Sequence, residues 1–544
     1  MNPIAILATA CGLGLAAESP AGVPDTRSLE TWIEAERTSG RLAAASLARI
    51  DGAKLDVSGF GSLDGSADAR PDADSQFQIG SITKVYTHLL LAESVAADEL
   101  RYDSTLADLL PEGARLGNPA LAGITLEALA SHRSGLPRVP PNLDLGNTVD
   151  PYAGYDESKL LEGLAMARAQ QPLGSFYTYS NFGVGLLGYV LGRRDGAGYR
   201  AALEERVIAP MRLVHTGFRP GKNAARAIQG GKPVSAWGFD DALAGAGSLW
   251  GSAGDLGRLV QAYLGHHEHG LKHTLAEDLR VLGAAGDFEI TRVWHVARAD
   301  GQPVYWHNGG TAGFHSVVGF RPDLGAGVAV LVSGDSDPTD VALRALGVAP
   351  IEPREVAVDE SVFGQYQLGP QFGIGVYRER GLLVAQASGQ PAFELHALGE
   401  DWYALGEVDA ALHFLREDGQ VQALELAQGG QLQQAPRTHP VALSQQRQEI
   451  QVDATVLAAL AGKYRFAPGV ELEVSVDGQQ LLARLARLAR LAGQPTFPVY
   501  PRSADRYFYK VVDAELAFER DAQGEVTAVV LHQGGIEQRA TRVR

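Results

Sequence analysis

The stretch FQIGSITKVYT, residues Phe77–Thr87, decides the fold and the chemistry that we expect of this chain. A short apolar run ends at Gly80, and apolar residues with helical spacing then continue to about Leu100. Ser81 is therefore predicted near a helix N-terminus, with Lys84 one turn later on the same face. A serine hydroxyl attacks only when a base takes its proton, and a lysine with a lowered pKa can be that base.

A Ser-x-x-Lys pair is a weak signal by itself, because such pairs arise by chance on many helices. The chain has eight lysines, and only Lys84 has a serine three residues before it. A helix N-terminus also favours the oxyanion that forms during acyl transfer. The tetrapeptide therefore fits a structural and a catalytic interpretation equally well, and partners elsewhere in the chain have to decide between them.

Length and composition limit the classes of protein to consider. A chain of 544 residues suggests about three domains. A net charge of −17 argues against nucleic acid as a partner and favours cationic over anionic substrates. Cys11 is the only cysteine, so no disulfide can form within the chain. No residue pattern indicates a cofactor, and the sequence leaves the oligomeric state undetermined.

The N-terminus resembles an export signal. Residues 4–17 are apolar, too short for a membrane span but suited to the core of a signal peptide at 1–17. No Lys or Arg precedes Arg27, so the charged first region of such a signal is missing. A lipoprotein anchor at Cys11 and a cytoplasmic protein with a frayed apolar terminus are the alternatives to a periplasmic or secreted protein. No later stretch is long and apolar enough to span a bilayer.

Residues 25–350 have the pattern of an α/β (α+β) domain with an antiparallel sheet flanked by helices. An Asp51-Gly52 turn should join the first two strands. The strands are expected at 43–50, 54–60, 314–320 and 327–332, and the helices after Gly80, at 124–132, at 181–191 and after Ser252. The helix at 181–191 is rich in glycine, which predicts close packing, and Ser252 with Asp255 fits a capping box.

An internal repeat follows residue 350, where short alternating strands replace helical periodicity. Gly364-Gln365-Tyr366 matches Gly462-Lys463-Tyr464, and Asp401-Trp402-Tyr403 matches Asp505-Arg506-Tyr507. We therefore expect two small all-β barrel domains, at residues 355–437 and 453–544. The second copy has extra residues at 482–492, which we interpret as a duplication that lengthens a hairpin.

Two later motifs supply partners for Ser81. Tyr179 can act as a general base, and Asn181, two residues later, can orient Lys84 and a substrate amide. His307 and Gly309 form a His-x-Gly motif between two predicted strands, where glycines let a ligand approach the backbone. Each motif alone also fits an ordinary loop.

In this order, Ser81-x-x-Lys84, Tyr179-x-Asn181 and His307-x-Gly309 resemble the serine penicillin-recognising hydrolases: class C β-lactamases, DD-peptidases, D-aminopeptidases and related esterases. The resemblance covers about residues 25–345. It implies a β-lactamase/transpeptidase-like fold, and the repeats resemble the lipocalin-like barrels appended to some members. The order of domains resembles that of a D-aminopeptidase with two such barrels after the catalytic domain.

The resemblance also implies roles for these residues. Ser81 would be acylated, while Lys84 and Tyr179 share the duties of base and acid. Asn181 and Gly309 would bind and orient the substrate, and His307 would line the strand side of the site and either bind the substrate or tune Tyr179. The backbone N–H groups of Ser81 and Gly310 would form the oxyanion hole, with no metal involved. His266, His267, His269 and His273 lack the His-Glu-x-x-His spacing, so we expect a solvated loop there.

One departure from the family pattern bears on the substrate. Class C β-lactamases have lysine at the position of His307, so this chain is a doubtful β-lactamase. The expected function is hydrolysis of a small peptide, amide or ester through an acyl-enzyme, most nearly as a D-aminopeptidase. The alternatives are a class C-type β-lactamase, a DD-carboxypeptidase, or a non-catalytic sensor that keeps the penicillin-binding fold.

Overall fold

The computed structural model describes residues 26–543 except 145–146, 148, 169–173, 175–176, 286–287, 350–358, 370–371, 380–381, 389, 391, 400, 406–409, 429–430, 441–449, 451, 468–469, 479, 488–496, 510–513 and 534–535. The chain divides into two compact units. Along the C-terminal part of the chain, residues up to 351 belong to the first unit and residues from 352 onward belong to the second. The predicted signal peptide and Cys11 lie outside the described residues and stay predictions. Within the described residues, no helix has the length and apolar character needed to cross a membrane.

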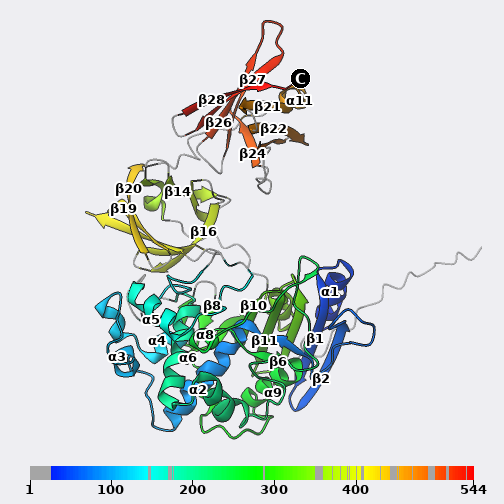
Figure 1. Cartoon of the computed structure of the whole chain (residues 1–544), viewed down its shortest axis with the longest axis vertical. Coiled ribbons are helices and arrows are strands. Elements are labelled where there is room, and N and C mark those ends of the chain that lie inside the picture. The colour runs from blue at the N-terminus through cyan, green and yellow to red at the C-terminus, as the bar shows by residue number, and fades with distance from the viewer. Residues whose placement is uncertain are drawn as a thin grey trace, which may run out of the picture. The chain divides into compact units, whose positions relative to one another are not determined.

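An eight-stranded antiparallel sheet is the centre of the first unit, in the order β2-β1-β12-β11-β10-β9-β8-β7 (Figure 1). The strands are β1 (Leu42–Asp51), β2 (Lys54–Gly61), β7 (Gly283–Ala285), β8 (Phe288–Ile290), β9 (His295–Ala299), β10 (Gln302–Thr311), β11 (Phe314–Arg321) and β12 (Ala326–Gly334). The predicted β1–β2 hairpin is confirmed, and so is the pairing of β11 with β12.

Helices cover both faces of this sheet. On one face, Leu29 of α1 (Thr26–Thr38) and Val341 of α10 (Thr339–Ala345) share a core cluster with Val328 of β12. On the other face, a Cβ at Gly327 would lie 2.8 Å from Val260 of α9 (Ala253–Tyr263). Strand β12 is buried along its whole length, which is why its sequence is apolar except for Ser333.

Two helices beside the sheet carry predicted site residues. Helix α2 (Thr83–Ala96) follows the 3-10 turn η1 (Gly80–Ile82), and α6 (Asn181–Asp195) packs closely, as its glycines predicted. A Cβ at Gly192 would lie only 2.1 Å from the backbone nitrogen of Tyr199. The helix expected at 124–132 is shorter, because α4 (Leu126–Ala130) ends before His132, whose φ is 58°. The other helices of this unit are α3 (Leu106–Leu109), α5 (Glu157–Met166), α7 (Tyr199–Leu203) and α8 (Asp241–Ala244).

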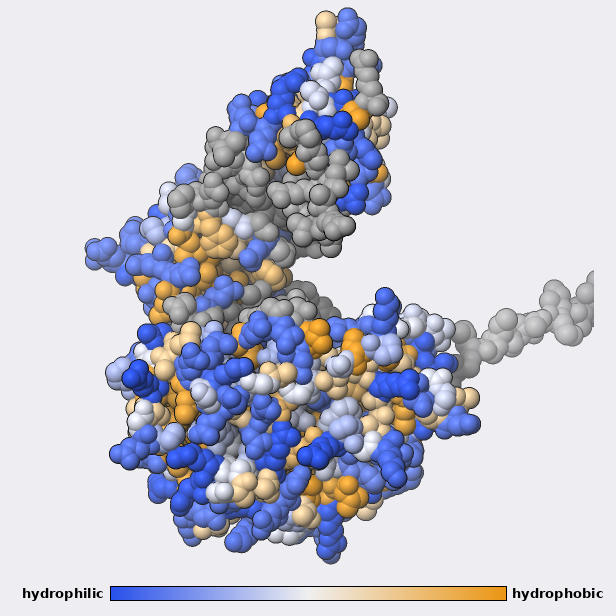
Figure 2. All heavy atoms as spheres, viewed as in Figure 1, coloured by the Kyte–Doolittle hydropathy of each residue, from blue (hydrophilic) through white to orange (hydrophobic). Residues whose placement is uncertain are grey.

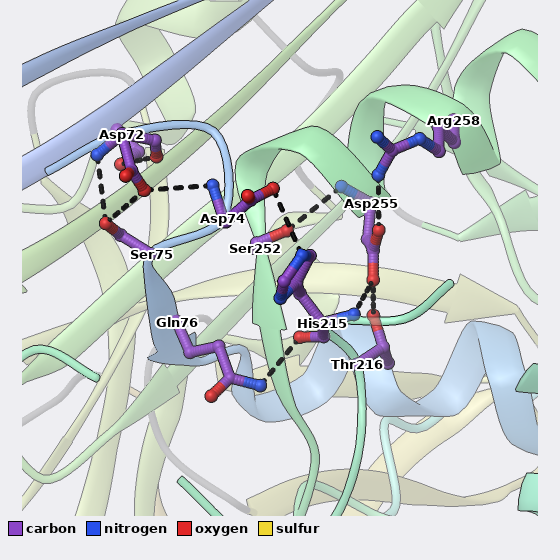
Figure 3. A network of polar contacts seen from close by, with 10 residues as sticks. Asp72, Asp74, Ser75, Gln76, His215, Thr216, Ser252, Asp255 and Arg258 are labelled. Atoms are coloured by element: carbon purple, nitrogen blue, oxygen red, sulfur yellow. Dashed lines mark hydrogen bonds and ion pairs between the residues drawn. The ribbon is translucent and has the colours of Figure 1, made fainter. Parts of the chain in front are cut away.

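The predicted capping box at the start of α9 is only half present. The Ser252 hydroxyl accepts a hydrogen bond from the Asp255 N–H at 3.1 Å, as an N-cap should. The buried Asp255 carboxylate instead accepts from the His215 backbone N–H at 2.7 Å and the Thr216 hydroxyl at 3.0 Å, and it pairs with Arg258 (Figure 3). Asp255 therefore ties α9 to a loop 40 residues away, which spacing alone does not indicate.

The second unit contains two closed eight-stranded barrels, and residues 135–141 and 166–178 are also assigned to it. The first barrel contains β13 (Gly364–Gly369), β14 (Phe372–Glu379), β15 (Leu382–Ala387), β16 (Ala392–Gly399), β17 (Trp402–Leu405), β18 (Ala410–Glu417), β19 (Gln420–Gln428) and β20 (Gln431–His439). The second contains β21 (Gly462–Ala467), β22 (Val470–Asp477), β23 (Gln480–Arg487), β24 (Phe497–Pro501), β25 (Arg506–Tyr509), β26 (Ala514–Arg520), β27 (Val526–Gln533) and β28 (Ile536–Arg542), preceded by α11 (Ala454–Leu460). The all-β barrels are thus confirmed, whereas the exact domain limits stay predictions.

Equivalent contacts confirm that the barrels are repeats. Arg416 pairs with Asp401 in the first barrel, and Arg520 pairs with Asp505 in the second. The hydroxyl of Tyr366 donates to the carbonyl of Val362, four residues earlier, and its counterpart Tyr464 donates to Leu460 in the same way. Of the extra residues at 482–492, those up to 487 belong to β23, and the rest lie outside the described residues.

The visible surface of the first unit mixes hydrophilic and hydrophobic residues (Figure 2). Large exposed hydrophobic side chains in its described part are far apart in the sequence, such as Val149, Val214 and Val234. The net charge of the whole chain, −17, should weaken binding of anionic molecules generally.

Candidate active site

Ser81 lies in the turn η1, directly before α2, and is half-buried. The preceding Gly80 has a φ of 50°, a conformation that glycine adopts without steric cost. A Cβ at Gly80 would also lie 2.8 Å from the backbone nitrogen of Gly310 on β10. The turn and the strand therefore touch backbone to backbone, and the hydroxyl of Ser81 is held at this junction.

Lys84 is the centre of the polar contacts around Ser81. Its side chain is only 1% exposed. The Nζ atom donates to Ser81 Oγ at 3.0 Å, to Asn181 Oδ1 at 2.8 Å and to the backbone carbonyl of Ala246 at 2.7 Å. Three acceptors match the three N–H bonds of an ammonium group. The structure thus brings together Ser81, Lys84 and Asn181, as the sequence predicted.

Tyr179 and Asn181 stand on either side of the residue that caps α6. The Ser180 hydroxyl accepts from the Gly183 N–H at 2.8 Å, which fixes the start of the helix. Asn181 receives the Lys84 hydrogen bond and donates through Nδ2 to the hydroxyl of Tyr152 at 3.0 Å. The half-buried Tyr179 ring has its centre 4.8 Å from Nζ of Lys84. All four side chains of the first two motifs therefore meet at one place.

The strand edge of β10 provides the other side of the site. Strand β9 pairs with β10 only as far as Trp306, so the following residues face the turn that holds Ser81. A two-residue turn joins Thr311 to Phe314, which makes these residues a hydrogen-bonded pair. By the alternation of an antiparallel ladder, the N–H of Gly310 then points away from β11. This orientation suits the predicted oxyanion hole.

Gly309 allows the close approach between the strand and the nucleophile turn. A Cβ at this position would lie 2.1 Å from the carbonyl oxygen of Ile79 and 2.8 Å from the backbone nitrogen of Ser81. Atoms of that size cannot approach so closely, so a side chain would push β10 away from η1. Gly309 thus contributes to the site by having no side chain between β10 and η1.

The ring of His307 is completely buried, which disfavours the first of its two expected roles, substrate binding, relative to the second, tuning of Tyr179. Nδ1 contacts the backbone carbonyl of Asn308 at 2.7 Å, and Nε2 has no hydrogen-bond partner among the described residues. The ring stacks on His295, with 5.0 Å between the ring centres. Burial, with the nearby charges of His295 and Lys84, holds the pKa of His307 well below its usual value of 6.5. Because its ring is buried, His307 is better placed to affect the groups next to it than to contact substrate directly.

Three residues that contribute to the site lie outside the three predicted motifs. Ala246 acts through its carbonyl, which no side-chain motif can show. Tyr152 lies in a loop without periodicity, and its ring stacks on Phe239 at 4.5 Å. His295 lies on β9 with its ring 6.4 Å from that of Tyr179, and burial, with the Lys84 charge, lowers its pKa to about 3. Only its place on the strand next to His307 could have indicated it.

One group of three side chains in the described part of the chain has the geometry to hold a metal: His88, His273 and Asp278, all buried. Nε2 of each histidine lies 2.7 Å from Asp278 Oδ1, and Tyr263 donates to Oδ2 at 2.9 Å. A metal ligand normally has a partner for its other ring nitrogen, but Nδ1 of His88 has none in the described residues. We therefore interpret this cluster as a hydrogen-bonded network. The loop at 266–269 is half-buried to exposed, in agreement with the prediction, but the prediction was wrong for His273, which is buried because its ring binds Asp278.

Comparison with known families agrees with this geometry. Residues 29–351, more than half of the chain, match the family named Beta-lactamase. The chain belongs to the Beta-lactamase family. Residues 446–542 match a second family, described as a domain of unknown function (DUF3471), and this range contains the second barrel. The Beta-lactamase family assignment confirms the resemblance inferred from the three motifs.

Individual relatives are distant. The chain is 27% identical to the D-alanyl-D-alanine-carboxypeptidase/endopeptidase AmpH of Escherichia coli K12 over 40% of this chain and 56% of AmpH. It is 27% identical to penicillin-binding protein 4 of Amycolatopsis lactamdurans over 60% of this chain and 93% of the relative. Thus the chain spans little more than half the length of AmpH.

Solved structures support the Beta-lactamase fold. The crystal structure of SurE aligns with a TM-score of 0.54 and 21% identity over 76% of this chain and 98% of that chain. A class C β-lactamase aligns with a TM-score of 0.52 and 17% identity over 60% and 97%. At these identities the likeness shows the fold alone.

Proposed function

We propose that this protein is a serine hydrolase that cleaves amide or ester bonds through an acyl-enzyme at Ser81. The observation that carries the proposal is the 3.0 Å hydrogen bond between Lys84 Nζ and Ser81 Oγ inside a cluster that also contains Asn181. Membership of the Beta-lactamase family, whose members are generally serine hydrolases, supports it.

The geometry supports a two-step reaction. Lys84, after passing one proton to its surroundings, takes the Ser81 proton as Oγ bonds to the substrate carbonyl carbon. The carbonyl oxygen becomes an oxyanion, which the N–H groups of Ser81 and Gly310 stabilise. When the carbonyl re-forms, the bond to the leaving amine or alcohol breaks, and Lys84 with Tyr179 returns a proton to it. Water then attacks the ester by the reverse proton path and frees Ser81.

Asn181 has a separate part in this proposal. Its carboxamide oxygen holds Lys84, while Tyr152 accepts from its amide nitrogen. Both contacts fix the rotamer of the side chain, so that it orients the lysine and one edge of the substrate. Lys84 consequently keeps a defined position when the proton moves.

The side of the site that β10 forms carries no charge at His307, which favours a substrate without a carboxylate near this strand. A lysine at the position of His307 would supply a permanent positive charge, whereas a buried histidine with a lowered pKa stays neutral near pH 7. The net charge of −17 also disfavours anions. We infer a D-aminopeptidase-like action on amides or esters with a neutral or cationic acyl part. The name of the relative AmpH, a carboxypeptidase/endopeptidase, is consistent with cleavage of peptide amides.

A comparison of substrates on the wild-type enzyme tests this proposal. We expect a higher kcat/KM for a D-amino-acid anilide or a short ester than for a chromogenic cephalosporin. A hundredfold preference for the cephalosporin, about 2.7 kcal/mol in transition-state binding, would identify a β-lactamase instead. Permanent stoichiometric labelling by the cephalosporin without turnover would identify a sensor. Wild type is used because a lysine in place of the buried His307 would add a second buried cation near Lys84.

A further inference from the structure

His132 occupies a strained position directly beside the Tyr179 motif. It follows the short helix α4 and is only 2% exposed. Its φ of 58° lies in the left-handed region, which few non-glycine residues adopt, although Asn, Asp and His do so more often than the others. Such backbone conformations persist where the surrounding structure holds them, and they are concentrated at functional sites.

The imidazole of His132 contacts two consecutive residues of the motif. Its ring centre lies 4.3 Å from the ring centre of Tyr179, with 31° between the planes. Its Nδ1 atom accepts a hydrogen bond from the backbone N–H of Ser180 at 3.0 Å. Ser180 is in turn the N-cap of α6, which begins with Asn181. One side chain thus holds the phenol ring by packing and the backbone after it by a directed hydrogen bond.

We propose that His132 is a positioning residue, which holds Tyr179-Ser180-Asn181 in register with Ser81 and Lys84. The inference rests on the proposed acyl transfer at Ser81, because it concerns the geometry of the groups that move its proton. His132 accepts from the Ser180 backbone, whereas Ser81 is hydrogen-bonded to Lys84, so we assign His132 a positioning role and not a catalytic one.

The chemistry of the ring explains why the acceptor matters. Nδ1 accepts a hydrogen bond, so this nitrogen carries no proton and the Ser180 N–H is satisfied within the protein interior. Without this acceptor, the buried N–H of Ser180 at the start of α6 would lose its hydrogen bond to His132. The segment would then shift so that this N–H could donate to another acceptor. A displacement of about 1 Å at reacting groups can lower a rate about a hundredfold.

Asparagine and glycine make a matched pair of replacements. Both tolerate a left-handed backbone, so neither His132→Asn nor His132→Gly suffers the strain that alanine would introduce. Both also remove the ring that packs on Tyr179. They differ in the hydrogen-bond acceptor. Oδ1 of asparagine is attached to Cγ, as Nδ1 of histidine is, so it can accept from the same N–H. Glycine has no side-chain acceptor.

The test measures kcat and KM of both variants on a short chromogenic ester, with thermal melting to establish folding. We expect His132→Asn to stay within about tenfold of wild type, and His132→Gly to lose about a hundredfold in kcat with KM changed less than threefold. Equal kcat values for the two variants, at any level, would overturn the positioning role. If the glycine variant does not fold, the kcat of His132→Asn relative to wild type decides, and a loss of about a hundredfold in a folded His132→Asn protein would overturn the positioning role. Absence of turnover in wild type would instead contradict the proposed function.

Discussion

The Nζ atom of Lys84 lies 3.0 Å from the Oγ atom of Ser81, at the junction between the turn η1 and helix α2. The same nitrogen lies 4.8 Å from the centre of the Tyr179 ring. The buried Lys84 can therefore accept the proton that leaves Ser81, and the Tyr179 phenol lies close to Lys84. This arrangement has consequences that substitutions can measure.

Lys84 and Tyr179 should behave as one proton-transfer unit. We expect Lys84→Ala and Tyr179→Phe each to lower kcat/KM by about 10²- to 10⁴-fold, in the range of general acid–base catalysis. The double variant should be hardly slower than the slower single variant, because removing either residue already breaks the shared path. Steady-state kinetics of all four proteins on one ester gives the comparison. Strictly additive free energies would show that the two residues act independently.

Gly309 and Gly310 should respond differently to the same added methyl group. The Cβ of Gly309→Ala would lie 2.1 Å from a carbonyl oxygen in η1, so we expect displacement of the nucleophile turn and at least a hundredfold loss of kcat/KM. The Cβ of Gly310→Ala meets nothing closer than His315 at 3.7 Å, and the backbone N–H is retained. This control should keep activity within about threefold. Comparable activities in the two variants would contradict the steric role of Gly309.

The buried cluster around Asp278 should make stability depend on pH. Burial alone would raise the pKa of Asp278, but the charge of His88 and hydrogen bonds from both histidines lower it below 3.8. Burial opposes the protonated form of His273, but its bond to Asp278 outweighs this, and the pKa lies above 6.5. The Asp278 contribution is lost as pH falls through its lowered pKa. The His273 contribution is complete below pH 6.5 and is lost as pH rises through the raised pKa.

Thermal melting of wild type and Asp278→Asn between pH 5 and 9 measures this contribution. At pH 6 the substitution should destabilise the fold by about 3–5 kcal/mol, as expected when one partner of a buried ion pair is removed. The difference in Tm between the two proteins should shrink as pH rises, because the wild-type pair is itself lost. A constant difference across this range would mean that the protonation of His273 does not contribute to stability.

Local patterns in the sequence predicted the parts of the fold that depend on neighbouring residues. The Asp51-Gly52 turn indicated the β1–β2 hairpin, and the spacing of Ser81 and Lys84 placed both on one side of a helix start. The repeated tripeptides predicted two barrels, because each copy must form the same strands and contacts. Such features need only the immediate sequence.

Other features arise from contacts between distant segments, which no local pattern encodes. His88 meets Asp278 across 190 positions, and Asp255 turns its carboxylate to a loop 40 residues before it. The ring of the buried His307 stacks on His295 of the neighbouring strand, a contact that the motif does not encode, so the motif left open whether His307 binds substrate or tunes Tyr179. His132 was placed at the end of a helix, and only its backbone angle and its bond to Ser180 show a more specific position.

Covalent labelling shows whether Ser81 is the nucleophile. The measurement is intact-protein mass spectrometry after reaction with a fluorophosphonate, followed by peptide mapping, on wild type and Ser81→Ala. We predict one adduct per wild-type chain on the peptide that contains Ser81. The Ser81→Ala protein should melt at the same temperature, form no adduct and lose turnover by about 10³-fold or more. Equal labelling of both proteins, or turnover by Ser81→Ala near the wild-type rate, would contradict the role of Ser81 as the nucleophile.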